Sequence, residues 1–200
     1  MNNIFRGLGI ALVTPFKQNG EIDYDALERL IEYQIENGAD FFTILATTGE
    51  SPCLSAEEKN ELTKTIVKIV GGRVPILKYC GGNYTAAVVE EIRQTDWKGI
   101  DGILSICPYY NKPSQEGLYQ HFKAIAEVSP LPIVLYNVPA RTGVNMKAET
   151  TVRIATDFPN VVAIKEAAGS LEQVDEIIKN KPKHFEVISG DDAMTFPMIA

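Results

Sequence analysis

The chain has 200 residues, 45% of them hydrophobic, and a formal net charge of −7 at pH 7. This size and apolar content suit one domain with one core, and the negative charge makes nucleic acid or an anionic membrane surface a poor partner. No apolar run is long enough to cross a bilayer, and the N-terminus lacks the apolar stretch of a signal peptide. We therefore expect a soluble, cytoplasmic protein. A small anionic substrate stays compatible with the net charge, because local arginines and backbone dipoles can hold it.

Seven short apolar runs predict strands, and the amphipathic stretches between them predict helices. The predicted strands are Leu8–Val13, Phe41–Ala46, Val74–Leu77, Gly102–Ile106, Ile133–Tyr136, Val161–Ile164 and Phe185–Ile188. Helical spacing puts apolar side chains on one face in the first two helices, namely Leu27, Leu30, Ile31 and Ile35, then Leu62, Ile66, Ile69 and Val70.

Residues that cap helix N-termini mark where the helices begin. Ser55 and Glu58 have the S-x-x-E spacing of a capping box, and Asp23, Ser114 and Ser170 are good N-cap residues for other helices. No Gly/Ser-rich linker interrupts the series. We therefore expect a single catalytic domain over residues 1–200.

The cysteines and histidines suggest neither a disulfide frame nor a metal site. Cys53, Cys80 and Cys107 are odd in number, lack C-x-x-C spacing and lie within or beside apolar runs, as reduced cytosolic thiols do. His121 and His184 have no metal-ligand spacing with each other or with the cysteines, and we interpret both as structural.

Repeated strand–helix units fit either an open doubly wound sheet or a (β/α)₈ barrel. A doubly wound dinucleotide fold would carry G-x-G-x-x-G after the first strand, where this chain has Thr14-Pro15-Phe16. Barrel enzymes build their sites from the carboxyl ends of many strands, which is where the polar residues of this chain fall. We therefore predict an α/β fold of the (β/α)₈ TIM-barrel class.

The chain ends at Ala200, within the helix expected after the seventh strand. About seven βα units are therefore expected, with no eighth strand, and seven strands alone would leave two open edges. The chain is then either a fragment of a longer protein or is closed by another segment.

Lys165 ends the apolar run Val161–Ile164, which is typical of a strand buried on both faces. Burial lowers the pKa of a lysine toward the neutral amine, and a neutral amine is the nucleophile that forms a Schiff base with a ketone. The alternative is a lysine whose long stem carries its ammonium group out to water.

Other polar residues at strand ends have both a chemical and a structural interpretation. The turn at Thr47, Thr48 and Gly49 can hold a carboxylate through hydroxyl and backbone donors, or is an ordinary polar loop. Tyr136 can relay protons or pack in the core with a satisfied hydroxyl. Arg141 can clamp a carboxylate or be a solvated surface side chain.

Several long motifs in order resemble one family, the dihydrodipicolinate synthase / N-acetylneuraminate lyase group of pyruvate-dependent, Schiff-base-forming barrel aldolases. The resemblance begins near Gly9 and continues to the end of the chain. It is carried by T-T-G-E at Thr47–Glu50, P-Y-Y-N-K-P-S-Q-E-G-L-Y-Q-H-F at Pro108–Phe122, L-Y-N-V-P-A-R-T-G at Leu135–Gly143, I-K-E-A at Ile164–Ala167 and S-G-D-D at Ser189–Asp192.

The resemblance implies a role for each site residue. Lys165 would form the imine with pyruvate, Thr48 with Gly49 would hold the pyruvate carboxylate, and Tyr136 would transfer protons in a relay with Thr47 and with Tyr110 of a neighbouring subunit. No further cofactor and no metal would be needed, and a homo-oligomer, dimer or tetramer, is implied.

Arg141 stands where the synthase branch binds the carboxylate of aspartate semialdehyde, the substrate that joins pyruvate to give 4-hydroxy-tetrahydrodipicolinate for lysine and diaminopimelate synthesis. An allosteric lysine site would include Ser51, Asn83 and Tyr109. At the positions that correspond to the lysine-binding residues of inhibitable family members, this chain has Ala56, Lys59 and Ala87. We therefore predict weak inhibition by lysine or none.

Three departures from the family pattern stand out. Ala46 replaces the usual glycine, the third strand ends in bulkier residues at Lys78–Asn83, and the family's eighth strand and C-terminal helical domain are not in this chain. Two alternatives stay open. One is a related aldolase acting on a sugar-acid aldehyde, of the N-acetylneuraminate or 2-keto-3-deoxy acid type, and the other is a non-catalytic truncated fragment.

Overall fold

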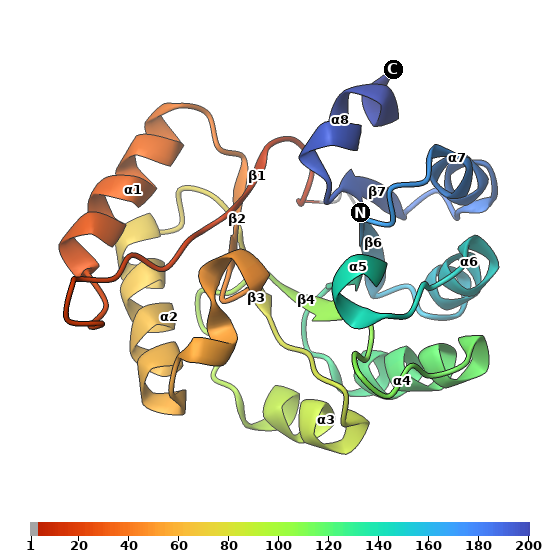
Figure 1. Cartoon of the computed structure of the whole chain (residues 1–200), viewed down its shortest axis with the longest axis horizontal. Coiled ribbons are helices and arrows are strands. Elements are labelled where there is room, and N and C mark those ends of the chain that lie inside the picture. The colour runs from red at the N-terminus through yellow and green to blue at the C-terminus, as the bar shows by residue number, and fades with distance from the viewer. Residues whose placement is uncertain (1–3) are drawn as a thin grey trace. The chain divides into compact units, whose positions relative to one another are not determined.

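The computed structural model describes residues 4–200 (Figure 1). These residues form two compact units. The amino-terminal unit consists of Ile4–Tyr79 with Trp97–Gly102, and the carboxy-terminal unit consists of Cys80–Asp96 with Ile103–Ala200. That residues 1–200 form one catalytic domain stays a prediction.

The amino-terminal unit is a parallel sheet with two helices packed against each other. The sheet has the order β1–β2–β3, with Gly9 opposite Phe41 and Phe42 opposite Ile76. Figure 1 shows α1 and α2 lying side by side next to these strands. The elements are β1 (Gly9–Ala11), α1 (Tyr24–Glu36), β2 (Phe41–Ile44), the 3₁₀ turns η1 (Thr47–Gly49) and η2 (Ser51–Cys53), α2 (Ala56–Val70) and β3 (Ile76–Tyr79).

The core of this unit follows from the apolar pattern of the sequence. All four residues of β2 are buried, as a strand covered on both faces requires. Leu27 and Ile31 of α1 and Leu62 and Ile66 of α2 are also buried, so the predicted apolar faces are the ones that pack inward.

The carboxy-terminal unit continues the strand–helix alternation. Its four strands pair in parallel in the order β4–β5–β6–β7, and α4, α6 and α7 follow one another along one side of it in Figure 1. The elements are α3 (Thr85–Gln94), β4 (Gly102–Ile106), α4 (Gln115–Val128), β5 (Ile133–Asn137), α5 (Pro139–Thr142), α6 (Ala148–Asp157), β6 (Val161–Glu166), α7 (Leu171–Asn180), β7 (Glu186–Ser189) and α8 (Asp192–Ile199).

Hydrogen bonds confirm the predicted helix starts. Ser55 and Glu58 form both halves of a capping box, with the Ser55 Oγ accepting from the Glu58 N–H at 3.1 Å and Glu58 Oε2 accepting from the Ser55 N–H at 2.7 Å. Asp23, Ser114 and Ser170 cap α1, α4 and α7 as predicted. Each satisfies a backbone donor that the first helical turn leaves unpaired.

The seven strands lie where the apolar runs predicted them, with ends shifted by one or two residues in most cases. The expectation that all three cysteines lie within or beside the apolar strands is wrong for Cys53. Cys53 lies in η2 and is exposed, because the chain forms two 3₁₀ turns after β2. Cys80 and Cys107 directly follow β3 and β4 and are buried.

None of the helices in the described part of the chain combines the length and the apolar character that crossing a membrane would require.

Candidate active site

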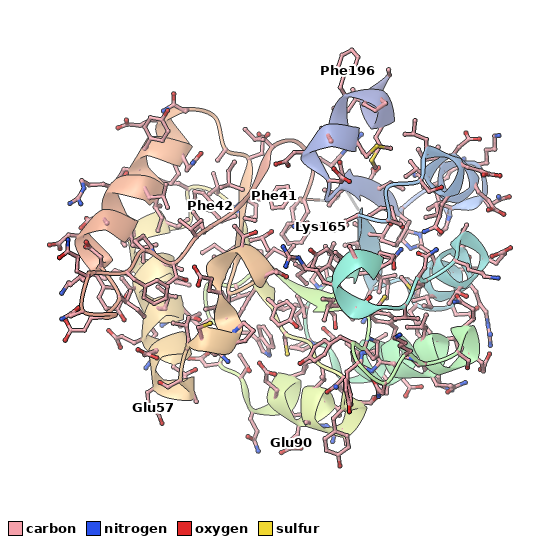
Figure 2. All side chains as sticks on the ribbon, in the orientation of Figure 1. Phe41, Phe42, Glu57, Glu90, Lys165 and Phe196 are labelled. Atoms are coloured by element: carbon pink, nitrogen blue, oxygen red, sulfur yellow. The ribbon has the colours of Figure 1, made fainter. Side chains whose placement is uncertain are left out.

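Lys165 lies near the end of β6, directly opposite Tyr136 of β5 in the parallel pairing. Its Nζ is 4.9 Å from the centre of the Tyr136 ring. Figure 2 shows the Lys165 side chain extending from β6. Burial lowers the pKa of this lysine, and the nearby Asp192 carboxylate opposes the shift by stabilising the ammonium form. The strand end thus presents an amine with an increased neutral fraction next to a phenol.

Gly190 packs against the stem of this lysine. A Cβ at Gly190 would lie 2.8 Å from Cγ and 3.0 Å from Cε of Lys165, and 3.2 Å from the Cβ of Ala167. These separations are shorter than carbon atoms normally adopt. The S-G-D-D motif therefore includes a glycine that leaves room for the lysine side chain.

Tyr136 is 5% exposed. The next residue pair along the two strands is Asn137 opposite Glu166, and the Asn137 Nδ2 donates to both carboxylate oxygens of Glu166 at 3.0 and 3.1 Å. Neither Asn137 nor Glu166 was predicted as a site residue. The sequence signal was present, since both flank the predicted catalytic residues, but nothing in it indicated that they bond to each other.

Arg141 lies on α5, the short helix that follows β5, and its side chain is exposed. The helix ends at Gly143, whose φ of 73° is a left-handed conformation that glycine adopts without strain. The Thr142 hydroxyl accepts from the Val144 N–H at 3.3 Å and donates to the Val144 carbonyl at 2.9 Å. The end of the short helix that carries the arginine is therefore held by hydrogen bonds between the Thr142 side chain and the following backbone.

Tyr109 and Tyr110 occupy the loop after β4. Tyr110 is 87% exposed, and its φ of 72° is unfavourable for a residue with a side chain. Tyr109 is 40% exposed. Asn111 Nδ2 donates to the Asn83 carbonyl at 3.1 Å, which ties this loop to the segment before α3.

The Thr47–Gly49 turn is in the amino-terminal unit. It forms η1, held by a hydrogen bond of 2.7 Å from the Thr14 hydroxyl to the Gly49 carbonyl. Glu50 follows with a φ of 53°, and the neighbouring Ser51 is buried. Because Lys165 belongs to the other unit, the roles of Thr47, Thr48 and Gly49 toward it stay predictions.

Two buried groups near the strands are kept uncharged. Burial lowers the pKa of His121 to about 4, so the ring is neutral at pH 7, and its Nδ1 lies 2.9 Å from the Thr85 hydroxyl. Burial also raises the pKa of the Cys107 thiol, and its Sγ lies 3.8 Å from Asn137 Oδ1. Both environments suit structural groups, and the structural interpretation of His121 and His184 stays a prediction.

The fold and this site define a class of protein: a parallel α/β protein with a partly buried, pKa-lowered lysine facing a tyrosine at adjacent strand ends. The chain belongs to the dihydrodipicolinate synthetase family, whose model matches residues 4–200. The family resemblance inferred from the sequence motifs is confirmed.

The relatives of this chain carry a consistent description. It is 58% identical over 194 residues to a protein of Phocaeicola vulgatus named 4-hydroxy-tetrahydrodipicolinate synthase, and this match covers 97% of this chain and 65% of that protein. A solved dihydrodipicolinate synthase from Thermotoga maritima is 46% identical, with a TM-score of 0.95 over 98% of this chain and 68% of the other.

A structure described as a monomeric dihydrodipicolinate synthase variant is also 46% identical, with a TM-score of 0.94 over 98% of this chain and 66% of the other. Scores of this size over nearly the whole chain confirm the predicted fold class. The chain spans about two thirds of the length of these relatives.

Proposed function

We propose that the chain is the catalytic part of a 4-hydroxy-tetrahydrodipicolinate synthase, which condenses pyruvate with L-aspartate 4-semialdehyde. The observation that carries the proposal is the pairing of Lys165 with Tyr136, in a chain 58% identical to a curated protein of that name. A lysine with a lowered pKa next to a phenol is suited to carbonyl condensation.

The chemistry follows from the amine. Neutral Lys165 attacks the ketone carbon of pyruvate, and loss of water leaves an imine. The imine withdraws electrons from the adjacent methyl group, which loses a proton to give an enamine. That carbon attacks the aldehyde of the second substrate. The amino group of aspartate semialdehyde can then replace the Lys165 nitrogen at the imine carbon, which closes the ring and frees the lysine.

Tyr136 is proposed as the proton carrier for these steps, because its ring lies 4.9 Å from the lysine amine. Thr48 and Gly49 are proposed to hold the pyruvate carboxylate, and Thr47 to pass protons with Tyr136. The ordered 3₁₀ turn at these residues supports that assignment, since its hydroxyls and N–H groups suit an anion. Arg141 is proposed to bind the carboxylate of aspartate semialdehyde.

Tyr110 is proposed to complete the relay in a second copy of the chain, within a dimer or tetramer. Its exposed ring on a left-handed backbone supports this, because a strained and exposed aromatic residue is unfavourable unless it has a partner. A cytoplasmic location also stays within the proposal, as does a lysine site near Ser51, Asn83 and Tyr109 at which we expect weak inhibition by lysine or none.

The test is a comparison of two aldehydes. Purified protein is incubated with pyruvate and either aspartate semialdehyde or a sugar-type aldehyde such as N-acetylmannosamine, with Lys165→Arg as the control. We expect condensation with aspartate semialdehyde to be faster by orders of magnitude and to require Lys165. Preference for the sugar aldehyde would support the sugar-acid aldolase instead, and no condensation with either would identify a non-catalytic fragment.

A further inference from the structure

We infer that Glu166 is a positioning residue for the reactive lysine: through a buried hydrogen-bond network with Asn137 and Gln173, its carboxylate fixes β6 against β5 so that Lys165 stays beside Tyr136. The inference rests on the proposed function and adds to it a residue that touches neither substrate nor the reacting atoms.

The Glu166 side chain is a buried carboxylate surrounded by amide donors. It is 2% exposed. Asn137 Nδ2 donates to both of its oxygens, Gln173 Nε2 donates to Oε2 at 3.0 Å, and the Ala168 N–H donates to Oε1 at 2.8 Å. Burial raises the pKa of Glu166, while these donors act in the opposite direction. The donors are all neutral, so the charge is solvated by a fixed set of protein dipoles.

The position of Glu166 in the strand explains why such a residue is needed. Successive strand residues point to opposite faces, so Lys165 and Glu166 face away from each other. The pairing of β5 with β6 changes register between Ile133 and Val134, just before the catalytic pair. A further slip of one residue would turn Lys165 to the wrong face. The bond between Asn137 and Glu166 fixes the register one residue beyond Lys165.

The network also reaches the segment that follows α5. The Met146 N–H donates to Asn137 Oδ1 at 3.0 Å, and Gln173 Nε2 donates to the Met146 carbonyl at 3.2 Å. Asn145 Nδ2 donates to Gln173 Oε1 at 2.8 Å. One set of side chains thus joins β5, β6, α7 and the chain leading from Arg141.

A purely stabilising role explains this arrangement poorly. Burying a carboxylate without a cation is costly, and apolar residues of similar volume usually stabilise a core as well or better. Directional hydrogen bonds instead fix geometry, and misplacement of a reacting group by about 1 Å can reduce a rate about 100-fold. We therefore expect the network to affect the reactivity of Lys165 more than the stability of the fold.

The test measures the rate at which borohydride traps the imine between pyruvate and the protein, with pyruvate at a saturating concentration. Circular dichroism confirms that each variant is folded. Glu166→Gln keeps the shape but turns an NH₂ group toward the existing donors. We expect its trapping rate to fall about 10- to 100-fold while the protein stays folded. Exchanging the partners, as Glu166→Gln with Gln173→Glu, restores a carboxylate facing an amide and should recover part of the rate.

Tyr119→Phe is the matched control. It removes a hydrogen bond of 2.8 Å to Asp157, elsewhere in the same unit, and should leave the trapping rate unchanged. If folded Glu166→Gln traps pyruvate at the wild-type rate, the inference is wrong. If Glu166→Gln does not fold, Gln173→Leu is the deciding variant. It keeps the Glu166 carboxylate and removes one of its hydrogen-bond donors, so an unchanged trapping rate would overturn the inference. A wild-type protein without any adduct on Lys165 would overturn the proposed function and this inference together.

Discussion

Lys165 and Tyr136 are direct partners across the β5–β6 pairing, with the lysine Nζ 4.9 Å from the centre of the tyrosine ring. The ring face favours the ammonium form of a cation above it, whereas burial favours the neutral amine and lowers the pKa. Burial is the larger influence. Parallel strands therefore hold next to each other the two residues that we propose as nucleophile and proton carrier.

The pH dependence of imine formation should respond to Asp192. The negative charge of Asp192 stabilises the Lys165 ammonium and raises its pKa against the effect of burial. Asp192→Asn removes that charge, so the pKa falls further and more amine is neutral at a given pH. The pH at which the rate of imine trapping by borohydride is half-maximal should therefore move to a lower value. Asp175→Asn, which alters an exposed pair with Lys179, is the control and should leave the midpoint unchanged. A shift of the Asp192→Asn profile to higher pH would contradict this account.

Tyr136→Phe should reduce kcat while changing the KM for pyruvate little. The substitution keeps the ring that packs beside Lys165 and removes the hydroxyl that we propose as the proton carrier, so general acid–base catalysis worth about 100- to 10,000-fold should be lost. Steady-state kinetics with both substrates measure the effect. A fall in pyruvate affinity without a fall in kcat would show that the tyrosine binds substrate and does not carry protons.

Arg141→Ala should raise the KM for aspartate semialdehyde much more than the KM for pyruvate. The arginine is exposed on α5, after the strand that carries Tyr136, so its removal leaves the lysine and tyrosine in place. Arg141→Lys keeps the charge but loses bidentate binding and should recover only part of the affinity. Equal changes in both KM values would indicate a structural role for this residue.

Gly190→Ala should slow imine formation more than it lowers stability. The new methyl group would lie 2.8 Å from Lys165 Cγ, so the lysine stem must move. Gly169→Ala is an informative comparison, because a Cβ there meets no atom within 4 Å although its φ of 71° disfavours alanine. We expect Gly169→Ala to lower the melting temperature with little effect on the trapping rate. We expect Gly190→Ala to lower the trapping rate with little effect on the melting temperature. Wild-type trapping by Gly190→Ala would refute the packing argument.

Much of the fold could be predicted because local signals and tertiary packing agree. Ser55 with Glu58, and the single N-caps at Asp23 and Ser170, mark helix starts by a mechanism confined to a few neighbouring residues. Strand ends were less accurate, because a run such as Val161–Ile164 shows apolar character but not where hydrogen bonding stops, and β6 continues to Glu166.

The site was predictable in part. The place of Lys165 at the end of an apolar strand predicted a burial-lowered pKa, and its direction is confirmed. Its partner Tyr136 followed from the family motif. The buried network of Glu166 was not predicted, because it depends on the β5–β6 register shift and on Gln173, seven residues later on another element. The left-handed backbone of Tyr110 also has no sequence signal, since glycine and asparagine are the residues that normally indicate it.

The most direct test of the account is to reduce the protein with borohydride in the presence of pyruvate and to map the adduct by peptide mass spectrometry. Only an imine is converted to a stable secondary amine, so the adduct should be found on Lys165 and be absent from Lys165→Arg. Lys78 is the informative competitor, because it is buried and its Nζ lies 5.2 Å from the centre of the Trp97 ring. Lys78→Arg should leave the adduct unchanged. An adduct on Lys78 or another lysine, or no adduct at all, would contradict the central claim.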